Sequence, residues 1–204
     1  MSLHIVPMES KYPVPYVTFG KHMSPPDVAE IIRVGQAKQL SHGQIGGTAD
    51  EIQTNLDYRN VLTSSITYDD APWLFERMVS AIASANRDFW SFDINGLFEN
   101  MNFLQYDAPD ESQPKPGKYD WHQDIGNGFS SLRKISTVTF LSDPKDYEGG
   151  QLHIFSQADD TLPEQNTTLG STVMFPSYLP HCVTPITKGR RMALVGWVTG
   201  PAFR

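Results

Sequence analysis

The 204-residue sequence contains a single cysteine, Cys182, which excludes an intrachain disulfide and favours a reducing compartment. Positive charge is also scarce: 16 lysines and arginines stand against 23 aspartates and glutamates, a formal net charge of −7. No basic run is present to contact a phosphate backbone, so nucleic acid is disfavoured as a partner. The chain also lacks an apolar stretch long enough to span a bilayer, and its first residues do not resemble a secretory signal. We therefore expect a cytoplasmic protein with neither a membrane nor a nucleic-acid partner, and its oligomeric state stays open.

Hydrophobic residues make up 39% of the chain and charged residues 19%, which is typical of a globular protein rather than a disordered one. The length suits one domain whose core needs no disulfide. We expect a single domain over residues 1–204, with a helical support region over 1–95 and a β-rich core over 96–204.

The first half of the chain predicts two helices. Residues 14–20 form an expected opening strand, and a helix should begin at Ser24, which can cap it ahead of two prolines in the first turn. The polar, glycine-rich residues 41–50 should be a loop. A second helix should begin near residues 70–72, with an apolar stripe through Leu74, Met78, Ile82, Ala85 and Phe89.

The second half predicts short strands separated by turns, which favours an antiparallel sandwich or barrel. A polar loop with three prolines, residues 107–118, interrupts the pattern. The expected strands cover residues 97–107, 132–143, 149–155, 170–176 and 190–200.

Three residues suggest a metal site. His122 and Asp124 are two apart where a strand should run into a turn, so both can reach one ion, although a chance pairing of a surface histidine with an acid is common. His181 would add a third ligand from a distant strand. Two histidines and one carboxylate leave three coordination positions open, as in non-haem Fe(II) oxygenases, whereas a structural zinc site closes its shell. A core histidine bonded to backbone is the alternative for His181.

An arginine could supply the partner of an anionic co-substrate. If residues 191–197 form a strand, Arg191 shares one face with Ala193, Val195 and Trp197, and Arg190 faces outward. A buried guanidinium needs an anion, and a dicarboxylate could bind it through two parallel hydrogen bonds. The alternative is that both arginines are surface charges at a hairpin. The paired glycines Gly149 and Gly150 suit a tight strand entry and need no catalytic role.

The series HQD, FLSDPKDYEGGQL, FPSYLPHCVTPITKGRR and GW, in this order and spacing, resembles the prolyl 4-hydroxylase-type 2-oxoglutarate oxygenases. Within them it is most similar to the PKHD-type hydroxylases, and the resemblance covers residues 98–199. It implies a mainly β fold with flanking helices: a double-stranded β-helix (a cupin-like jelly roll) with the N-terminal helices packed on its outer face.

The resemblance also implies a set of site residues. Fe(II) would be held by His122, Asp124 and His181, and Arg191 would pair with 2-oxoglutarate. Dioxygen would be the second co-substrate, with ascorbate supportive. Further contacts to the co-substrate fall on Tyr106, Ser136, Val183 and Trp197, with Leu152, Val138 and Phe140 in the walls and Tyr119 and Trp121 at the mouth.

Two departures from the family pattern concern the pocket. Some relatives carry a tyrosine where this chain has Phe140, so Ser136 or Tyr106 would take its place. The loop 107–118 is longer than in relatives, and we expect it to be mobile without substrate and to help form the binding groove. The remaining histidines should not bind the metal: His4, His22, His42 and His153.

The reaction that follows is hydroxylation of an unactivated C–H bond, with release of succinate and carbon dioxide. A prolyl residue in a peptide or protein is the favoured substrate. A free amino acid or another small molecule is an alternative, as is a non-catalytic cupin-like metal-binding module, which would not require a buried Arg191. A nucleic-acid demethylase should show basic surface patches, and a halogenase should lack a carboxylate at Asp124.

Overall fold

The computed structural model describes residues 14–46, 52–155 and 167–202, and its framework is a pair of antiparallel sheets. The larger sheet contains β1 (Val17–Phe19), β2 (Ser41–His42), β4 (Leu62–Ile66), β5 (Met101–Asp107), β7 (Arg133–Phe140), β8 (Tyr147–Gly149), β10 (Thr172–Pro176) and β12 (Ile186–Thr199). The smaller sheet contains β3 (Arg59–Asn60), β6 (Lys118–His122), β9 (Leu152–Ile154) and β11 (His181–Val183).

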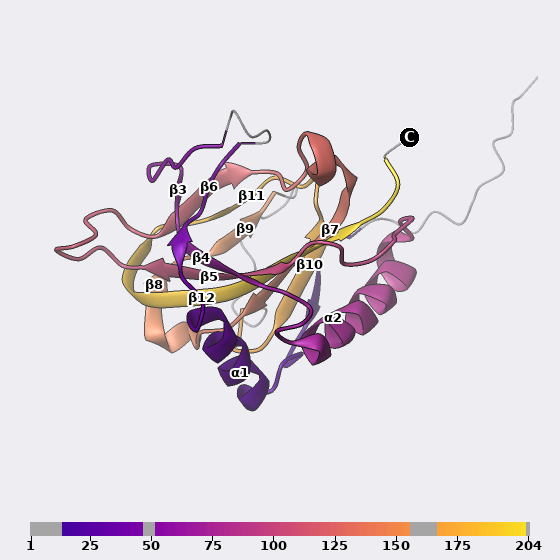
Figure 1. The fold of residues 1–204 in the computed structure, drawn as a ribbon, viewed down its shortest axis with the longest axis horizontal. Coiled ribbons are helices and arrows are strands. Elements are labelled where there is room, and N and C mark those ends of the chain that lie inside the picture. Colours follow the sequence, from indigo (N-terminus) through magenta and orange to yellow (C-terminus); the bar gives the residue numbers. More distant parts are fainter. Residues whose placement is uncertain (1–13, 47–51, 156–166, 203–204) are drawn as a thin grey trace, which may run out of the picture.

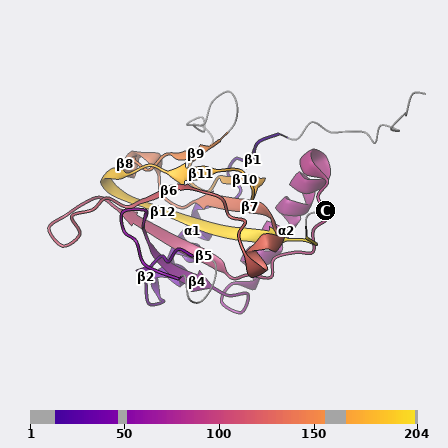
Figure 2. The ribbon, with the colours of Figure 1, turned by 90° about the horizontal axis from the view of Figure 1, so that it is seen from above.

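The larger sheet has the order β1-β10-β7-β12-β5-β4-β2, and β8 pairs with β12 off this path. The smaller sheet has the order β3-β6-β11-β9 and lies over one face of the larger one (Figure 2). Strands that are neighbours in space are distant in sequence, as in a jelly roll. The mainly β, double-stranded β-helix fold predicted from the sequence is confirmed.

Two helices, α1 (Pro25–Gln36) and α2 (Pro72–Ala85), cover the outer face of the larger sheet (Figure 1). The predicted cap is present: Ser24 and Asp27 form a reciprocal capping box at the start of α1. A π-helical turn, η1 (Asn86–Trp90), follows α2 and contains Phe89, the last residue of the apolar stripe predicted for this helix. Short 3-10 helices, η2 (Gly128–Leu132) and η3 (Pro144–Asp146), flank β7. None of the described helices is long and apolar enough to cross a membrane.

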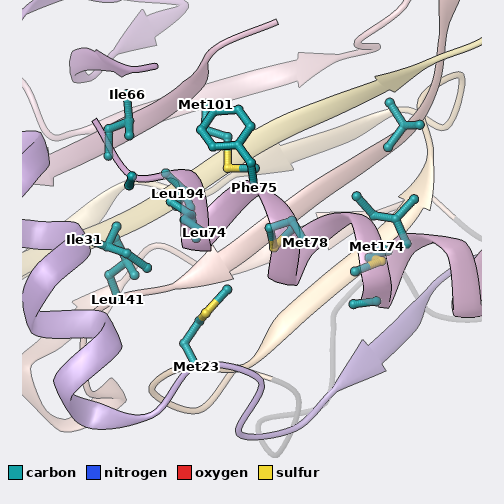
Figure 3. Packing of buried hydrophobic residues seen from close by; sticks show 14 of the residues in the cluster. Met23, Ile31, Ile66, Leu74, Phe75, Met78, Met101, Leu141, Met174 and Leu194 are labelled. Atoms are coloured by element: carbon teal, nitrogen blue, oxygen red, sulfur yellow. The ribbon is translucent and has the colours of Figure 1, made fainter. Parts of the chain in front are cut away.

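Side chains of the larger sheet alternate between two apolar clusters. The cluster against the helices includes Leu74 and Met78 of α2, which pack toward Leu194 and Met101 of the sheet (Figure 3). The cluster between the two sheets includes Leu104, Tyr106, Val138, Phe140, Phe175 and Ala193. The inner cluster borders the chemically active side chains described below.

The region before residue 95 departs from the prediction of a helical support. Besides the predicted opening strand, present as β1, it supplies β2 to β4, which extend both sheets. The predicted loop 41–50 begins with the two-residue strand β2, and its residues 47–50 lie outside the described part. The strands β2, β3 and β4, of two to five residues, carry too few alternating positions to be recognised by periodicity.

Candidate metal centre

The predicted ligands meet at one end of the smaller sheet. His122 is the last residue of β6 and His181 the first of β11, and the two are direct partners in the antiparallel pairing. Asp124 follows two residues after His122. Its carboxylate oxygens lie 3.4 Å from Nε2 of His181 and 3.8 Å from Nε2 of His122. Among the described residues, this is the one group of three or more side chains whose ligand atoms converge, all within 4.8 Å of one another.

Both imidazoles are oriented by backbone carbonyls. Nδ1 of His122 lies 2.7 Å from the carbonyl oxygen of Asp120, and Nδ1 of His181 lies 3.0 Å from that of Leu179. A proton on each Nδ1 would donate to these carbonyls and leave the Nε2 lone pairs directed at Asp124, which suits a metal ion. Burial, followed by the neighbouring His181, lowers the pKa of His122 to about 3, so its imidazole is neutral and able to bind metal.

The Asp124 carboxylate is held from behind. Oγ of Ser136 donates to Oδ2 at 2.5 Å, and Nη1 of Arg133 donates to the backbone oxygen at 3.0 Å. Burial raises the pKa of Asp124, but the two histidines and hydrogen bonds from Ser136 and Trp197 outweigh it, so the pKa lies below its usual value. The ionised form needed by a metal is therefore favoured. In this structure the Ser136 hydroxyl contacts a metal-ligand side chain, and its predicted contact with the co-substrate stays a prediction.

An irregularity in β6 determines which side chains reach the centre. His122 pairs with His181 and Tyr119 with Val183, so three steps on β6 oppose two on β11. This bulge puts the rings of Tyr119 and His122 on the same side, stacked with centroids 3.5 Å apart. Trp121, expected at the mouth, is 42% exposed and packs edge-on against His153. The structure does not bring Trp121 into the lining of the site.

Arg191 lies deep between the sheets with 1% exposure. Its Nε and Nη2, which form one edge of the guanidinium, are buried without a hydrogen-bond partner. Rings of Tyr106 and Phe140 flank its Cζ, with centroids 5.3 and 5.2 Å away. Arg190 points the opposite way and pairs with Asp107, as strand alternation predicts. A free edge with two parallel N–H donors is the shape that a carboxylate accepts in bidentate fashion.

One of the paired glycines makes room for this arginine. Gly150 has φ +66°, and a Cβ there would lie 3.0 Å from Cδ of Arg191 and 2.2 Å from Cδ1 of Ile186. A side chain at this position would push into the residues that fix the guanidinium. The structural role expected for the pair thus bears directly on the position of Arg191.

Two connected hollows meet at the metal-ligand cluster. The inner pocket, of about 40 Å³, reaches Arg191 and is lined by the predicted residues Tyr106, Tyr119, Val138, Leu152, Val183 and Trp197. The outer hollow, of about 870 Å³, opens beyond the cluster and includes Tyr58, Phe98, Asn102, Gln123 and Phe129. Five residues line both hollows: Arg59, Tyr119, His122, Asp124 and Trp197. The functions expected of the inner residues remain predictions.

Sequence reasoning missed Arg59, which lies on β3 beside the cluster. A strand of two residues gives no periodic signal, and no motif includes this arginine. Arg59 belongs to neither predicted helix nor any predicted strand, so no signal in the sequence indicates that it lies beside the cluster.

The loop between β5 and β6 is tied to its surroundings by hydrogen bonds. Nδ2 of Asn60 donates to the carbonyl oxygens of Lys115 and Pro116, and Oδ1 of Asp110 accepts from Ser112 and Gln113. Residues 108–117 are absent from the lining of both hollows. The proposed mobility of the loop and its part in substrate binding stay predictions.

The other described histidines lie apart from the cluster. His22 contacts the Thr172 hydroxyl, His42 is exposed on β2, and His153 packs against Trp121. His4 lies outside the described residues. No second convergent group of ligands occurs in residues 14–46, 52–155 and 167–202.

Comparison with known proteins agrees with this geometry. The family model of the 2OG-Fe(II) oxygenase superfamily matches residues 101–199, which include all three candidate ligands and Arg191. The chain is therefore similar to this superfamily over just under half of its length. The likeness implies Fe(II), 2-oxoglutarate and dioxygen, and the described donors suit them: two imidazoles and a carboxylate for iron, and an unpaired arginine edge for a dicarboxylate.

The relatives at the sequence level are PKHD-type hydroxylases. YbiX of Escherichia coli O8 (strain IAI1) is 26% identical over 194 residues, covering 92% of this chain and 77% of that protein. A PKHD-type hydroxylase of Synechococcus sp. (strain CC9605) is 41% identical over 80 residues, 39% of this chain. That match spans 36% of the relative, so the chain covers about a third of its length.

Solved structures support the fold. A prolyl-4-hydroxylase of Pseudomonas putida superposes with a TM-score of 0.67 at 18% identity, covering 92% of this chain and 94% of that one. A prolyl hydroxylase of Trichoplax adhaerens, in complex with a hypoxia inducible factor peptide fragment, gives a TM-score of 0.71 at 18% identity, covering 91% of this chain and 84% of that one.

Proposed function

We propose that this protein is a 2-oxoglutarate-dependent Fe(II) oxygenase that hydroxylates an unactivated C–H bond, with conversion of 2-oxoglutarate to succinate and carbon dioxide. One observation carries the proposal: a buried arginine with an unpaired edge lies in the same pocket as a convergent His-Asp-His group. A metal-binding jelly roll without 2-oxoglutarate would have no use for a desolvated guanidinium, because an unpaired buried charge is costly.

The chain's own residues would position the reactants. His122, Asp124 and His181 would hold the iron, and Ser136 would keep the Asp124 carboxylate oriented. The free edge of Arg191 would grip the distal carboxylate of 2-oxoglutarate. When bound, iron with 2-oxoglutarate and dioxygen supplies the oxidising power for C–H hydroxylation. The apolar walls of the inner pocket would exclude water from the co-substrate.

We further propose a prolyl residue in a peptide or protein as the substrate. The outer hollow supports this proposal, because it is wide and carries the exposed rings of Phe98 and Phe129 beside the cluster. The hydroxylase from Trichoplax adhaerens, whose fold is similar, was solved with a peptide. A free amino acid is the alternative substrate. The cytoplasm is the proposed compartment, in keeping with the lone buried Cys182.

The test is succinate release with Fe(II), ascorbate and 2-oxoglutarate, assayed against a panel of prolyl peptides and free amino acids. We expect one member of the panel to stimulate succinate formation and to gain one oxygen atom by mass spectrometry. In parallel, binding of 2-oxoglutarate to the metal-loaded protein is measured by calorimetry without oxygen. A protein that binds the metal but not 2-oxoglutarate would be the non-catalytic jelly roll instead.

A further inference from the structure

A second arginine stands at the junction of the two hollows. Arg59 lies on β3, in the smaller sheet, and lines both the inner pocket and the outer hollow. Arg191 lines only the inner pocket. Arg59 therefore borders the space left for a substrate, whereas Arg191 sits at the deep end.

The Arg59 guanidinium is held in a defined place. Its Nη1 donates to the carbonyl oxygen of Gln44 at 2.5 Å, and its Cζ lies 4.6 Å from the centroid of the Tyr119 ring. Gly43 leaves the space that it occupies: a Cβ there would be 2.7 Å from Nε and 2.9 Å from Cζ of Arg59. Because Gly43 does not have a positive φ, close approach rather than backbone conformation is what calls for glycine here.

The charge of Arg59 is left without a partner in the described structure. Its Nε is buried with no hydrogen bond, and no carboxylate of the described residues forms an ion pair with it. Two further charged residues in the outer hollow, Arg133 and Glu99, form an ion pair with each other, with Nη2 and Oε2 2.5 Å apart. Asp124 is directed at the two histidines. Among the described residues that line the outer hollow, Arg59 is therefore the positive group without an ion-pair partner, on a chain of net charge −7.

We propose that Arg59 recognises a carboxylate of the substrate and so selects acidic substrates over their neutral amides. This inference rests on the proposed function and adds the chemical class of the substrate. A guanidinium fixed by a carbonyl, a ring and a glycine is oriented before the ligand arrives, which lowers the entropic cost of pairing. The carboxylate comes either from the α-carboxyl group of a free amino acid or from an acidic side chain beside the target residue of a peptide.

The experiment measures binding rather than turnover. The full chain is loaded with Zn(II) in place of iron and saturated with 2-oxoglutarate, and calorimetric titrations use two matched pairs of probes. One pair is L-proline and L-prolinamide; the other is acetyl-Glu-Pro-amide and acetyl-Gln-Pro-amide. We expect the acidic member of one pair to bind roughly tenfold or more tighter than its amide, as a charge-assisted contact predicts. The pair that discriminates identifies the source of the carboxylate.

Variants assign any preference to Arg59. Arg59→Gln should abolish the acid-over-amide ratio while leaving the affinity for the amide within about twofold. Gly43→Ala, which keeps the charge but displaces the guanidinium, should reduce the ratio and covers the case in which Arg59→Gln does not fold. Arg190→Gln, at an exposed arginine, should keep the wild-type ratio. A merely structural role, such as supporting Tyr119, would weaken both members of a pair equally.

Two results would overturn the inference: no acid preference in the wild type for either pair, or a preference that survives in both Arg59→Gln and Gly43→Ala. The proposed function is judged separately, by whether 2-oxoglutarate binds to the Zn(II)-loaded protein before any probe is added.

Discussion

The two faces of the larger sheet are built by the same strands and both carry buried side chains, yet they differ in whether buried polar atoms lack hydrogen-bond partners. On the face toward α1 and α2, Ile135, Met174 and Leu194 are at most 1% exposed and belong to one apolar cluster. On the face toward the smaller sheet, Arg191 is as deeply buried and has two nitrogen atoms without partners. Burial alone therefore does not distinguish core from site in this protein. What distinguishes the site is the presence of buried guanidinium nitrogen atoms without a hydrogen-bond partner.

The contrast has an energetic consequence. Apolar side chains on the helix side are already in their best environment, so changing them should lower stability and little else. The buried arginine on the inner side lacks hydrogen-bond partners that a ligand could supply. Replacing it should therefore weaken ligand binding, while the free energy of unfolding without ligand stays similar or rises.

The largest effect should come from the metal-ligand carboxylate. Asp124→Asn keeps the shape but removes the charge, and we expect the affinity for a divalent metal to fall by at least about a hundredfold, since even outer partners of ligands account for 10–100-fold. Calorimetric titration with Zn(II) or Fe(II) measures this. Asp120→Asn, on an exposed side chain two residues before His122, is the control and should bind metal like the wild type. Equal metal affinity in Asp124→Asn would place the centre elsewhere.

On the opposite face, Leu194→Ala should lower the free energy of unfolding by about 2–5 kcal/mol, through lost burial and the cavity left behind. The folded fraction should bind metal and 2-oxoglutarate normally. Urea unfolding gives the first quantity and calorimetry the second. A strong loss of ligand affinity without a loss of stability would show that the two faces are not separable.

Arg191→Met should show the reverse pattern. Loss of a charge-assisted, two-point contact should weaken 2-oxoglutarate binding by roughly ten- to a hundredfold, with metal affinity nearly intact. Without 2-oxoglutarate, stability should be unchanged or higher, because an unpaired buried charge is gone. Saturating 2-oxoglutarate should raise the Tm of the wild type and not that of the variant. Arg190→Met, with its exposed side chain, should have a much smaller effect on 2-oxoglutarate, and equal effects at both positions would mean that the strand parity is wrong.

The smallest effect should come from the support of the carboxylate. Ser136→Ala removes the hydroxyl that donates to Asp124 and should weaken metal binding about tenfold. Thr139→Val removes an equally buried hydroxyl that contacts Thr172 on the other side of β7, and should leave metal affinity unchanged. If Ser136→Ala instead weakened only 2-oxoglutarate binding, the contact expected from family resemblance would be the correct one.

The sequence could predict the parts of this molecule that carry periodicity or a known motif. The cap at Ser24, the helix after residue 71 and the long strand through Arg191 follow from local chemistry and alternation. It could not predict the bulge in β6, because an extra residue in one strand is defined only against the partner strand. That bulge stacks Tyr119 on His122 and leaves Trp121 against His153, an arrangement that the family resemblance did not specify.

Arg59 was missed for a related reason. Its position depends on three features of residues that are distant from Arg59 in the sequence: a carbonyl at Gln44, a ring at Tyr119 and the absent side chain of Gly43. Each is ordinary by itself. Only the pairing of β3 with β6 brings them together beside the histidines.

The 14-residue strand β12 should tolerate insertions and deletions less well than the loops around the site. Between Arg191 and Trp197 it is paired with β5 and then β7 without a shift in register, so one added or lost residue would reverse the facing of every side chain beyond it. Such a change could place the side chain of a neighbouring residue where the Arg191 guanidinium lies, and we expect this to abolish function rather than weaken it. Length variation in this lineage should therefore accumulate between β5 and β6, where residues 108–117 can lengthen or shorten while Arg191 stays in place.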